Sequence, residues 1–108
     1  MKIGWIFLLI ASILEIGFVT TLKLTHDNKN SPLNIVFVVC LIGSFYFLDK
    51  SLSTIPVGTA YAIWTGIGAT GAAIIGIFYF KDPVTMGRLI FLGLLIISIV
   101  GLKLTSNH

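Results

Sequence analysis

The sequence predicts an all-α integral membrane protein with four transmembrane helices per chain. Hydrophobic residues make up 56% of the 108 residues. Charged residues make up only 10%, against roughly a quarter in a typical soluble domain. Four apolar stretches approach the roughly 17–25 helical residues that cross a bilayer core about 30 Å thick. Backbone groups in lipid must bond within the chain, so these stretches are expected to be helices.

We expect one domain over residues 1–108. The predicted helices lie at about residues 3–22, 33–50, 57–80 and 86–104. Polar and turn-forming segments separate them, namely KLTHDNKNSP, DKSLSTIP and KDPVT. No small-x-small cleavage site follows the first apolar run, so we expect this helix to be retained. The pattern predicts a multi-pass protein of the cell (plasma or inner) membrane.

The composition also excludes several classes of function. The net charge is +3, but the basic residues are scattered at the ends of apolar segments and form no nucleic-acid-binding cluster. Cys40 is the single cysteine, so the chain has no intrachain disulfide. The sequence contains no nucleophile–base pair, metal-ligand cluster or phosphate-binding loop. We therefore expect a protein that is not an enzyme and that uses neither a metal nor a cofactor.

Positive charges are nearly balanced between the two predicted sides of the membrane. One side would carry Lys2, Lys50 and Lys103, and the other Lys23, Lys29, Lys81 and Arg88. Because the Lys and Arg bias orients membrane proteins, three charges against four favours insertion in both orientations. Two opposed copies would then form an antiparallel, dual-topology dimer, with the inverted symmetry common in transporters. The alternative is a weak bias that still fixes one orientation.

Glu15 is the one carboxylate well inside an apolar span. A charge at the bilayer centre costs several kcal/mol, so such residues face a cavity, pair or become protonated. Burial disfavours the charged form, so this group can hold a proton at one moment and a cation at another. Ser12 and Phe18 lie on the same helix face and flank the predicted site. A neutral carboxyl that only hydrogen-bonds a neighbouring helix is the structural alternative.

The third span combines two aromatic residues with two closely spaced glycines. Tyr61 and Trp64 share a face, where aromatic rings can hold a cation and the tyrosine adds a hydroxyl group. Packing in the interfacial aromatic belt is the alternative, but Trp64 lies deeper than a belt residue usually does. Gly66 and Gly68 weaken the helix and permit a bend.

Small and hydroxylated residues mark the second and fourth spans. Ser44 is the one hydroxyl inside the second apolar run, where it can bond a neighbouring carboxylate or a substrate. Bonding to its own backbone is the alternative. Gly93, Ser98 and Gly101 in the fourth span predict a packing or dimer face.

The four short spans, the lone Glu15 and the motif IPVGTAYAIWTGIGA together resemble the small multidrug resistance family, over essentially the whole chain. The resemblance implies antiparallel dimers, of one chain or of two related subunits, that exchange protons for cations. It implies that Glu15 is the shared proton and substrate site, lined by Tyr61 and Trp64. It also implies a bend at Gly66 and Gly68 and a dimer-forming fourth helix.

The segments WTGIGA, KDPVT and GLKLTS resemble the guanidinium-exporter branch of this family. The quaternary-ammonium branch has serine and tyrosine where this chain has Thr65 and Leu41. Ser44 matches the serine that bonds the glutamate in the guanidinium branch. Phe18 stands where that branch has tryptophan, and Ser12 where it favours glycine. Because Phe18 cannot donate a hydrogen bond, the network that orients the glutamate would be altered.

The sequence thus predicts a proton-coupled antiporter that exports guanidinium or guanidinyl compounds and acts as an antiparallel homodimer. Two alternatives lie within the family, namely a quaternary-ammonium exporter and one subunit of a heteromeric pair. A non-transporting membrane subunit, in which Glu15 only pairs with a partner helix, is the alternative outside it. Reconstitution of the purified chain separates these possibilities.

Overall fold

The computed structural model describes residues 2–26 and 31–105, and four helices lie within these ranges. They are α1 (Lys2–Leu24), α2 (Leu33–Ser51), α3 (Val57–Phe78) and α4 (Met86–Leu104). Each is 19 to 23 residues long and apolar enough to cross a membrane. The prediction of a four-span, all-α chain is therefore confirmed. Lys29, one of the charges in the predicted topology, lies outside the described residues.

The helix ends differ from the predicted ones by two residues or fewer, and α3 shows why. It ends two residues earlier than expected because the chain turns back on itself there. The N–H group of Tyr79 still donates to the Ile75 carbonyl at 2.7 Å. Lys81 then adopts a left-handed φ of 61°, and the N–H group of Asp82 donates to the Gly76 carbonyl at 2.9 Å. A left-handed residue that returns bonds to the last turn is a common way to end a helix.

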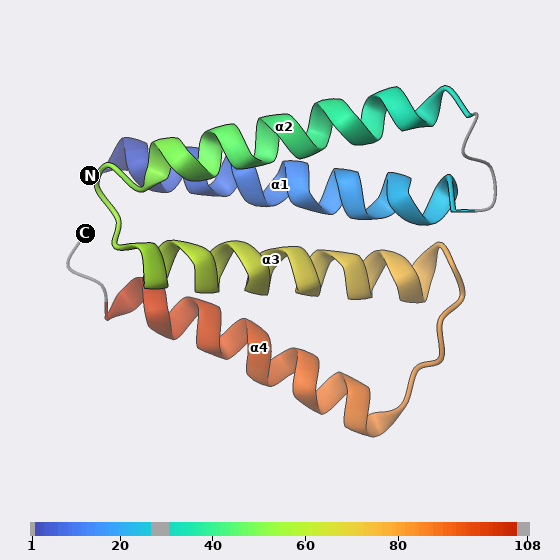
Figure 1. Ribbon diagram of the computed structural model, residues 1–108. Helices are drawn as coiled ribbons and strands as arrows, with labels where there is room; N and C mark the ends of the chain where they lie inside the picture. The colour runs from blue at the N-terminus through green and yellow to red at the C-terminus, as the bar shows by residue number, and fades with distance from the viewer. Residues whose placement is uncertain (1, 27–30, 106–108) are drawn as a thin grey trace.

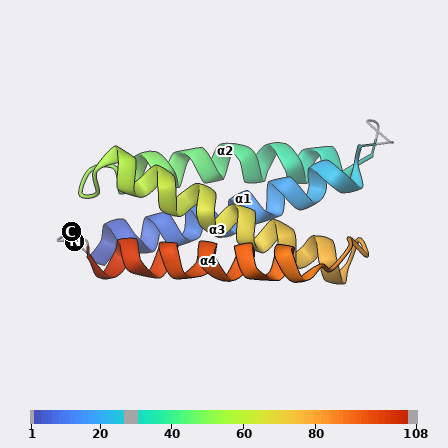
Figure 2. The same cartoon turned by 90° about the horizontal axis from the view of Figure 1, so that it is seen from below.

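The helices form a closely packed α1–α2 pair and a splayed α3–α4 pair (Figures 1 and 2). Helix α2 lies along α1, α3 crosses α1, and α4 runs back beside α3 to the end of the molecule where α1 begins. In the described chain, α4 makes no close backbone contact with α1 or α2. The fourth helix is therefore attached to the rest of the molecule mainly through α3.

Glycines on α3 allow these close approaches. A Cβ added to Gly66 would come within 2.9 Å of Ile99 on α4. A Cβ added to Gly71 would overlap the side chain of Ile16 on α1. Small residues that let helix backbones approach are typical of membrane helix packing. These two glycines thus allow α3 to approach two different neighbours.

The molecule is a thin slab. Its Cα atoms extend over 43 × 35 × 16 Å, and a single helix with its side chains is already about 10–12 Å across. The buried hydrophobic core is correspondingly small and centres on α1 and α3. It consists of Leu8, Ala11, Ile55, Ala60, Ile63 and Trp64. Helix α4 has no buried residue among those described, so most of its apolar surface must face lipid or another chain.

Candidate functional site

Glu15 lies near the middle of α1, and its carboxyl group is seated against α3 at Gly68. A Cβ added to Gly68 would overlap the carboxyl group. Because Gly68 is buried and has no side chain, the backbone of α3 itself forms one wall of the site. The sequence predicts Gly68 as a hinge position, whereas its contact with the carboxyl group becomes visible only in the packed structure.

The Oε1 atom of Glu15 is buried and has no hydrogen-bond partner among the described residues. Buried side-chain oxygens are usually hydrogen-bonded, so each exception needs an explanation. The ion pair observed in the described chain joins Arg88 to Asp82 and leaves Glu15 without a basic partner of its own. This oxygen therefore has unused hydrogen-bonding capacity in the single chain.

A chain of hydrogen bonds links α3, α2 and α1 one turn from Glu15. The indole Nε1 of Trp64 donates to Ser44 Oγ at 3.0 Å. The Ser44 hydroxyl in turn donates to the backbone carbonyl of Ala11 at 2.7 Å. All three residues are buried, and Ala11 lies four residues before Glu15 on the same face of α1. The structure thus gives Ser44 a partner on a neighbouring backbone instead of the Glu15 carboxyl group.

Ser12 is also fully buried, and its hydroxyl donates to the Leu8 carbonyl of its own helix at 2.8 Å. Bonding back to the preceding turn is common for serine in membrane helices. Ser12 and Ser44 therefore both donate to backbone carbonyls in this structure. Because a hydroxyl can rotate to suit another acceptor, either can change partner without a backbone shift.

Trp64 and Tyr61 occupy different environments although they share a helix face. Trp64 is only 5% exposed and has its N–H bonded, so packing in an interfacial belt does not describe it. Tyr61 is 57% exposed, and its ring centroid lies 5.8 Å from that of Trp64. The Phe45 ring on α2 also lies close to Trp64, with 5.3 Å between the ring centroids. An aromatic cluster thus extends from the buried interior to the surface of the single chain.

Phe18, one turn beyond Glu15, packs against α2. Its ring meets that of Phe37 edge to face, with 6.1 Å between centroids and 85° between planes. Such a pair is favourable but contains no polar atom. The residue that replaces tryptophan in the predicted branch therefore contributes packing and no hydrogen bond.

The predicted hinge and dimer residues have clear positions. Helix α3 is continuous through Gly66 and Gly68, which contact α4 and α1 respectively. A bend there stays a prediction. Gly93 and Gly101 on α4 have open space beside them, and the exposed Ser98 donates to the Leu94 carbonyl at 2.9 Å. This face of α4 is uncovered in the single chain, and its predicted role in dimer packing also stays a prediction.

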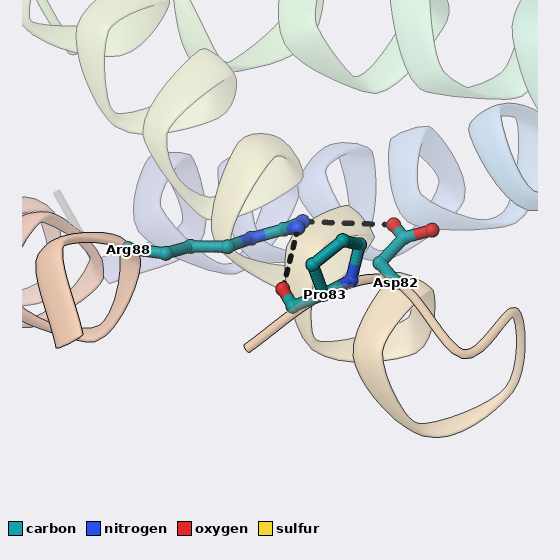
Figure 3. Close-up of polar contacts among 3 residues, drawn as sticks. All are labelled: Asp82, Pro83 and Arg88. Carbon is teal, nitrogen blue, oxygen red and sulfur yellow. Dashed lines mark hydrogen bonds and ion pairs between the residues drawn. The ribbon is translucent and has the colours of Figure 1, made fainter. Parts of the chain in front are cut away.

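One polar cluster was not singled out from the sequence. Arg88, in the first turn of α4, lies 3.5 Å from Asp82 in the preceding loop and donates to the Pro83 carbonyl at 3.1 Å (Figure 3). The opposite charges on either side of a proline were the available signal. Both side chains are partly exposed, so the pair contributes little stability, of the order of 0–1 kcal/mol.

The fold defines a class of protein, the small multi-pass membrane proteins with four spans. A family model described as Small Multidrug Resistance protein matches residues 3–95. The chain therefore belongs to the small multidrug resistance family and is a multi-pass protein of the plasma membrane. The predicted resemblance is confirmed.

Individual relatives match over nearly their whole length. A protein named Guanidinium exporter from Salmonella typhimurium strain LT2 is 44% identical over 104 residues, which are 96% of this chain and 99% of that protein. The protein of the same name from Citrobacter freundii is also 44% identical over 104 residues, with the same coverage. The one from Yersinia pseudotuberculosis is 40% identical over 103 residues, covering 95% of this chain and 99% of that protein.

Proposed function

We propose that the protein exports small organic cations in exchange for protons, with guanidinium and guanidinyl compounds as its substrates. The observation that carries this proposal is the buried, unpartnered Oε1 of Glu15 in the middle of a membrane-spanning helix. The similarity to proteins named Guanidinium exporter supports the choice of substrate. The chemistry of the site supports the coupling.

One carboxyl group serves both ligands in this mechanism. When Glu15 is deprotonated, its charge attracts a cation; when it is protonated, that charge is gone and the cation leaves. Because the two ligands compete for the same atoms, the protein exchanges them and does not carry them together. A guanidinium ion suits this site, since its planar N–H donors can pair with both oxygens of a carboxylate.

The neighbouring residues have supporting roles in the proposal. Ser44 and Trp64 hold α2 and α3 in register with the Ala11 turn of α1, which fixes the helix segment that carries Glu15. Tyr61 presents an exposed aromatic face beside Trp64, where a cation can be held before or after it reaches the carboxylate. Ser12 and Phe18 flank the carboxylate on α1. Gly66 and Gly68 allow α3 to change its shape as the site opens.

We further propose that two copies act together as an antiparallel homodimer. The nearly even charge balance favours both orientations in the membrane. A slab 16 Å thick leaves both of its faces uncovered, and a second copy would cover one of them. The two Glu15 carboxylates would then meet near the bilayer midplane. The open positions around Gly93 and Gly101 on α4 provide a surface for close helix packing.

A quaternary-ammonium exporter is the second candidate, and Phe18 favours it. A quaternary ammonium ion has no N–H donors and needs only negative charge and aromatic surface. The ring of Phe18 offers surface but no hydrogen bond to orient the carboxylate. This candidate uses the same residues, but it predicts that quaternary ammonium ions are transported in preference to guanidinium.

The deciding experiment is transport by proteoliposomes that contain only this chain. We expect guanidinium to enter with release of protons, faster than a bulky quaternary ammonium ion. Glu15→Gln should abolish coupled transport while cross-linking still detects the dimer, and Glu15→Asp should keep part of the activity. Coupled transport by Glu15→Gln would contradict the mechanism.

Two other results would each reject part of the proposal. Absence of a response to every cation would indicate a non-transporting subunit. Activity that requires a paralogous chain would indicate a heteromeric pair.

A further inference from the structure

An apolar trough runs between α4 and the α1–α3 pair. It consists of two hollows of about 410 and 290 Å³ that share Ile67, Ile99 and Val100 in their walls. The larger hollow reaches Trp5 and Lys103, at the end of the molecule where α1 begins and α4 ends. None of the residues predicted for the Glu15 site lines either hollow. The trough is therefore separate from the proposed transport site.

The trough is apolar along its length and has one cation at its end. Its walls contain no Asp or Glu. The hydroxyl of Thr70 donates to the Gly66 carbonyl at 2.8 Å and is already satisfied. Lys103, in the last turn of α4, places its ammonium group 4.4 Å from the centroid of the Trp5 ring. A lysine and a tryptophan at the end of a spanning helix are expected at the level of the lipid headgroups.

The dimensions of the trough suit a single hydrocarbon chain. On α1 its lining extends from Trp5 to Ile16, a distance of roughly 16 Å at 1.5 Å per residue, or about three helical turns. One turn of a helix about 10–12 Å across fills roughly 400–600 Å³. The two hollows together would hold little more than one such turn. The hollows are therefore small for a helix of another chain, which could place only about one turn in them.

We propose that the trough and Lys103 form a binding site for one anionic phospholipid. An acyl chain lies along Ile67, Ile99 and Val100, and the phosphate group accepts hydrogen bonds from the Lys103 ammonium. The Trp5 ring lies on one side of that ammonium group. Because the ammonium has three N–H donors, the others can still donate to a phosphate. Basic positions between membrane helices are known to recognise anionic headgroups. The site is independent of the direction and chemistry of transport.

The site is compatible with a dimer that packs through α4. Ile96, Ile99 and Lys103 lie three to four residues apart and share the face that lines the trough. Gly101 lies three residues before Leu104 of the lining and Gly93 lies seven before Val100, so these two open positions border the trough. Ser98 is two residues from both Ile96 and Val100 and therefore lies on the other side of α4. A second copy that packs on the Ser98 side of α4 leaves the trough in contact with lipid.

Native mass spectrometry of delipidated protein tests the headgroup half of the site. The protein is offered equal amounts of phosphatidylglycerol and phosphatidylcholine with identical acyl chains. We expect wild type to retain the anionic lipid in preference by about fivefold, the factor that corresponds to one lysine near an anionic headgroup. Lys103→Gln should abolish the preference, and Lys103→Arg should keep it.

Lys50→Gln is the matched control. Lys50 is also a lysine in a last helical turn, with its ammonium 5.3 Å from the centroid of the Tyr46 ring. It lines neither hollow, so its replacement should leave the preference unchanged. Equal loss in Lys50→Gln and Lys103→Gln would show a general surface-charge effect and overturn the proposal.

Val100→Phe tests the acyl-chain half of the site, because Val100 borders both hollows. We expect this variant to lose retention of both lipids several-fold while its oligomeric state stays that of wild type. Unchanged retention would overturn the proposal. So would a changed oligomeric state with unchanged retention, since the trough would then belong to a contact between copies.

Discussion

The carboxyl group of Glu15 on α1 lies directly against Gly68 on α3. One helix thus supplies the ionisable group and the next supplies the space that it occupies. The position of the carboxylate is therefore tied to the packing of α1 on α3. Any change that moves these helices relative to each other also moves the proposed proton and cation site.

Gly68→Ala tests this relationship. The added Cβ would overlap the Glu15 carboxyl group, so either the side chain or the helix must shift. We expect cation transport to fall at least tenfold, and stability to fall by about 1–3 kcal/mol, as for other overpacked cores. Transport is measured in proteoliposomes and stability by thermal unfolding in detergent.

Gly58→Ala is the control on the same helix, because nothing lies within 4 Å of a Cβ at that position. Alanine favours a helix by about 1 kcal/mol over glycine, so this variant should be as stable as wild type or more so. Loss of transport in both variants would indicate a general need for flexible glycines in α3, and would remove the case for a specific contact with Glu15.

The hydrogen bond from Trp64 to Ser44 provides a second prediction. Ser44→Ala leaves a buried indole N–H without its acceptor, and Trp64→Phe removes the donor. In a double-mutant cycle we expect a coupling energy of about 0.5–1.5 kcal/mol, the range for interhelical hydrogen bonds in membranes. Reversible unfolding in mixed micelles gives the four free energies. A coupling near zero would mean that the two residues stabilise the protein independently.

Most of the fold could be predicted from the sequence because the bilayer sets strict requirements. Length and apolarity locate the spans, and proline and charge mark their ends. The contacts between helices were not predictable in the same way. Gly66 and Gly68 are two residues apart, and the sequence does not specify that one meets Ile99 and the other Glu15. Such assignments depend on how α3 is rotated about its axis, which packing decides.

In the candidate site, too, some features could be predicted from the sequence and others depend on packing. Glu15 is evident from sequence because a carboxylate in lipid is rare. The Ser44 hydroxyl donates to the backbone carbonyl of Ala11. Every residue has a backbone carbonyl, so the residue types in the sequence do not indicate which one is the acceptor. The left-handed Lys81 was also not foreseen, since non-glycine residues seldom adopt that conformation.

Competition at Glu15 predicts how binding depends on pH. Lowering the pH favours the protonated carboxyl, which has no charge to hold a cation, so the apparent affinity for guanidinium must fall. For each proton that the cation displaces, the apparent affinity for guanidinium can fall by at most about tenfold per pH unit. Titrations followed by tryptophan fluorescence at several pH values measure this slope. Asp82→Asn, in the exposed loop pair, should leave the slope unchanged, whereas an affinity independent of pH would exclude competition.

Phe18→Trp tests whether this position sets substrate preference. The change introduces an indole N–H three residues from Glu15 on the same face of α1. If this N–H donates to the carboxylate, it holds the carboxylate in the plane that suits a bidentate guanidinium ion. A quaternary ammonium ion makes no such bonds and gains nothing from that orientation. We expect the preference for guanidinium over quaternary ammonium to rise about fivefold, as one hydrogen bond of about 1 kcal/mol allows. Phe37→Trp places an indole on the other ring of the same aromatic pair, so an equal rise there would show that ring size at this contact, and not a new donor, changes the preference.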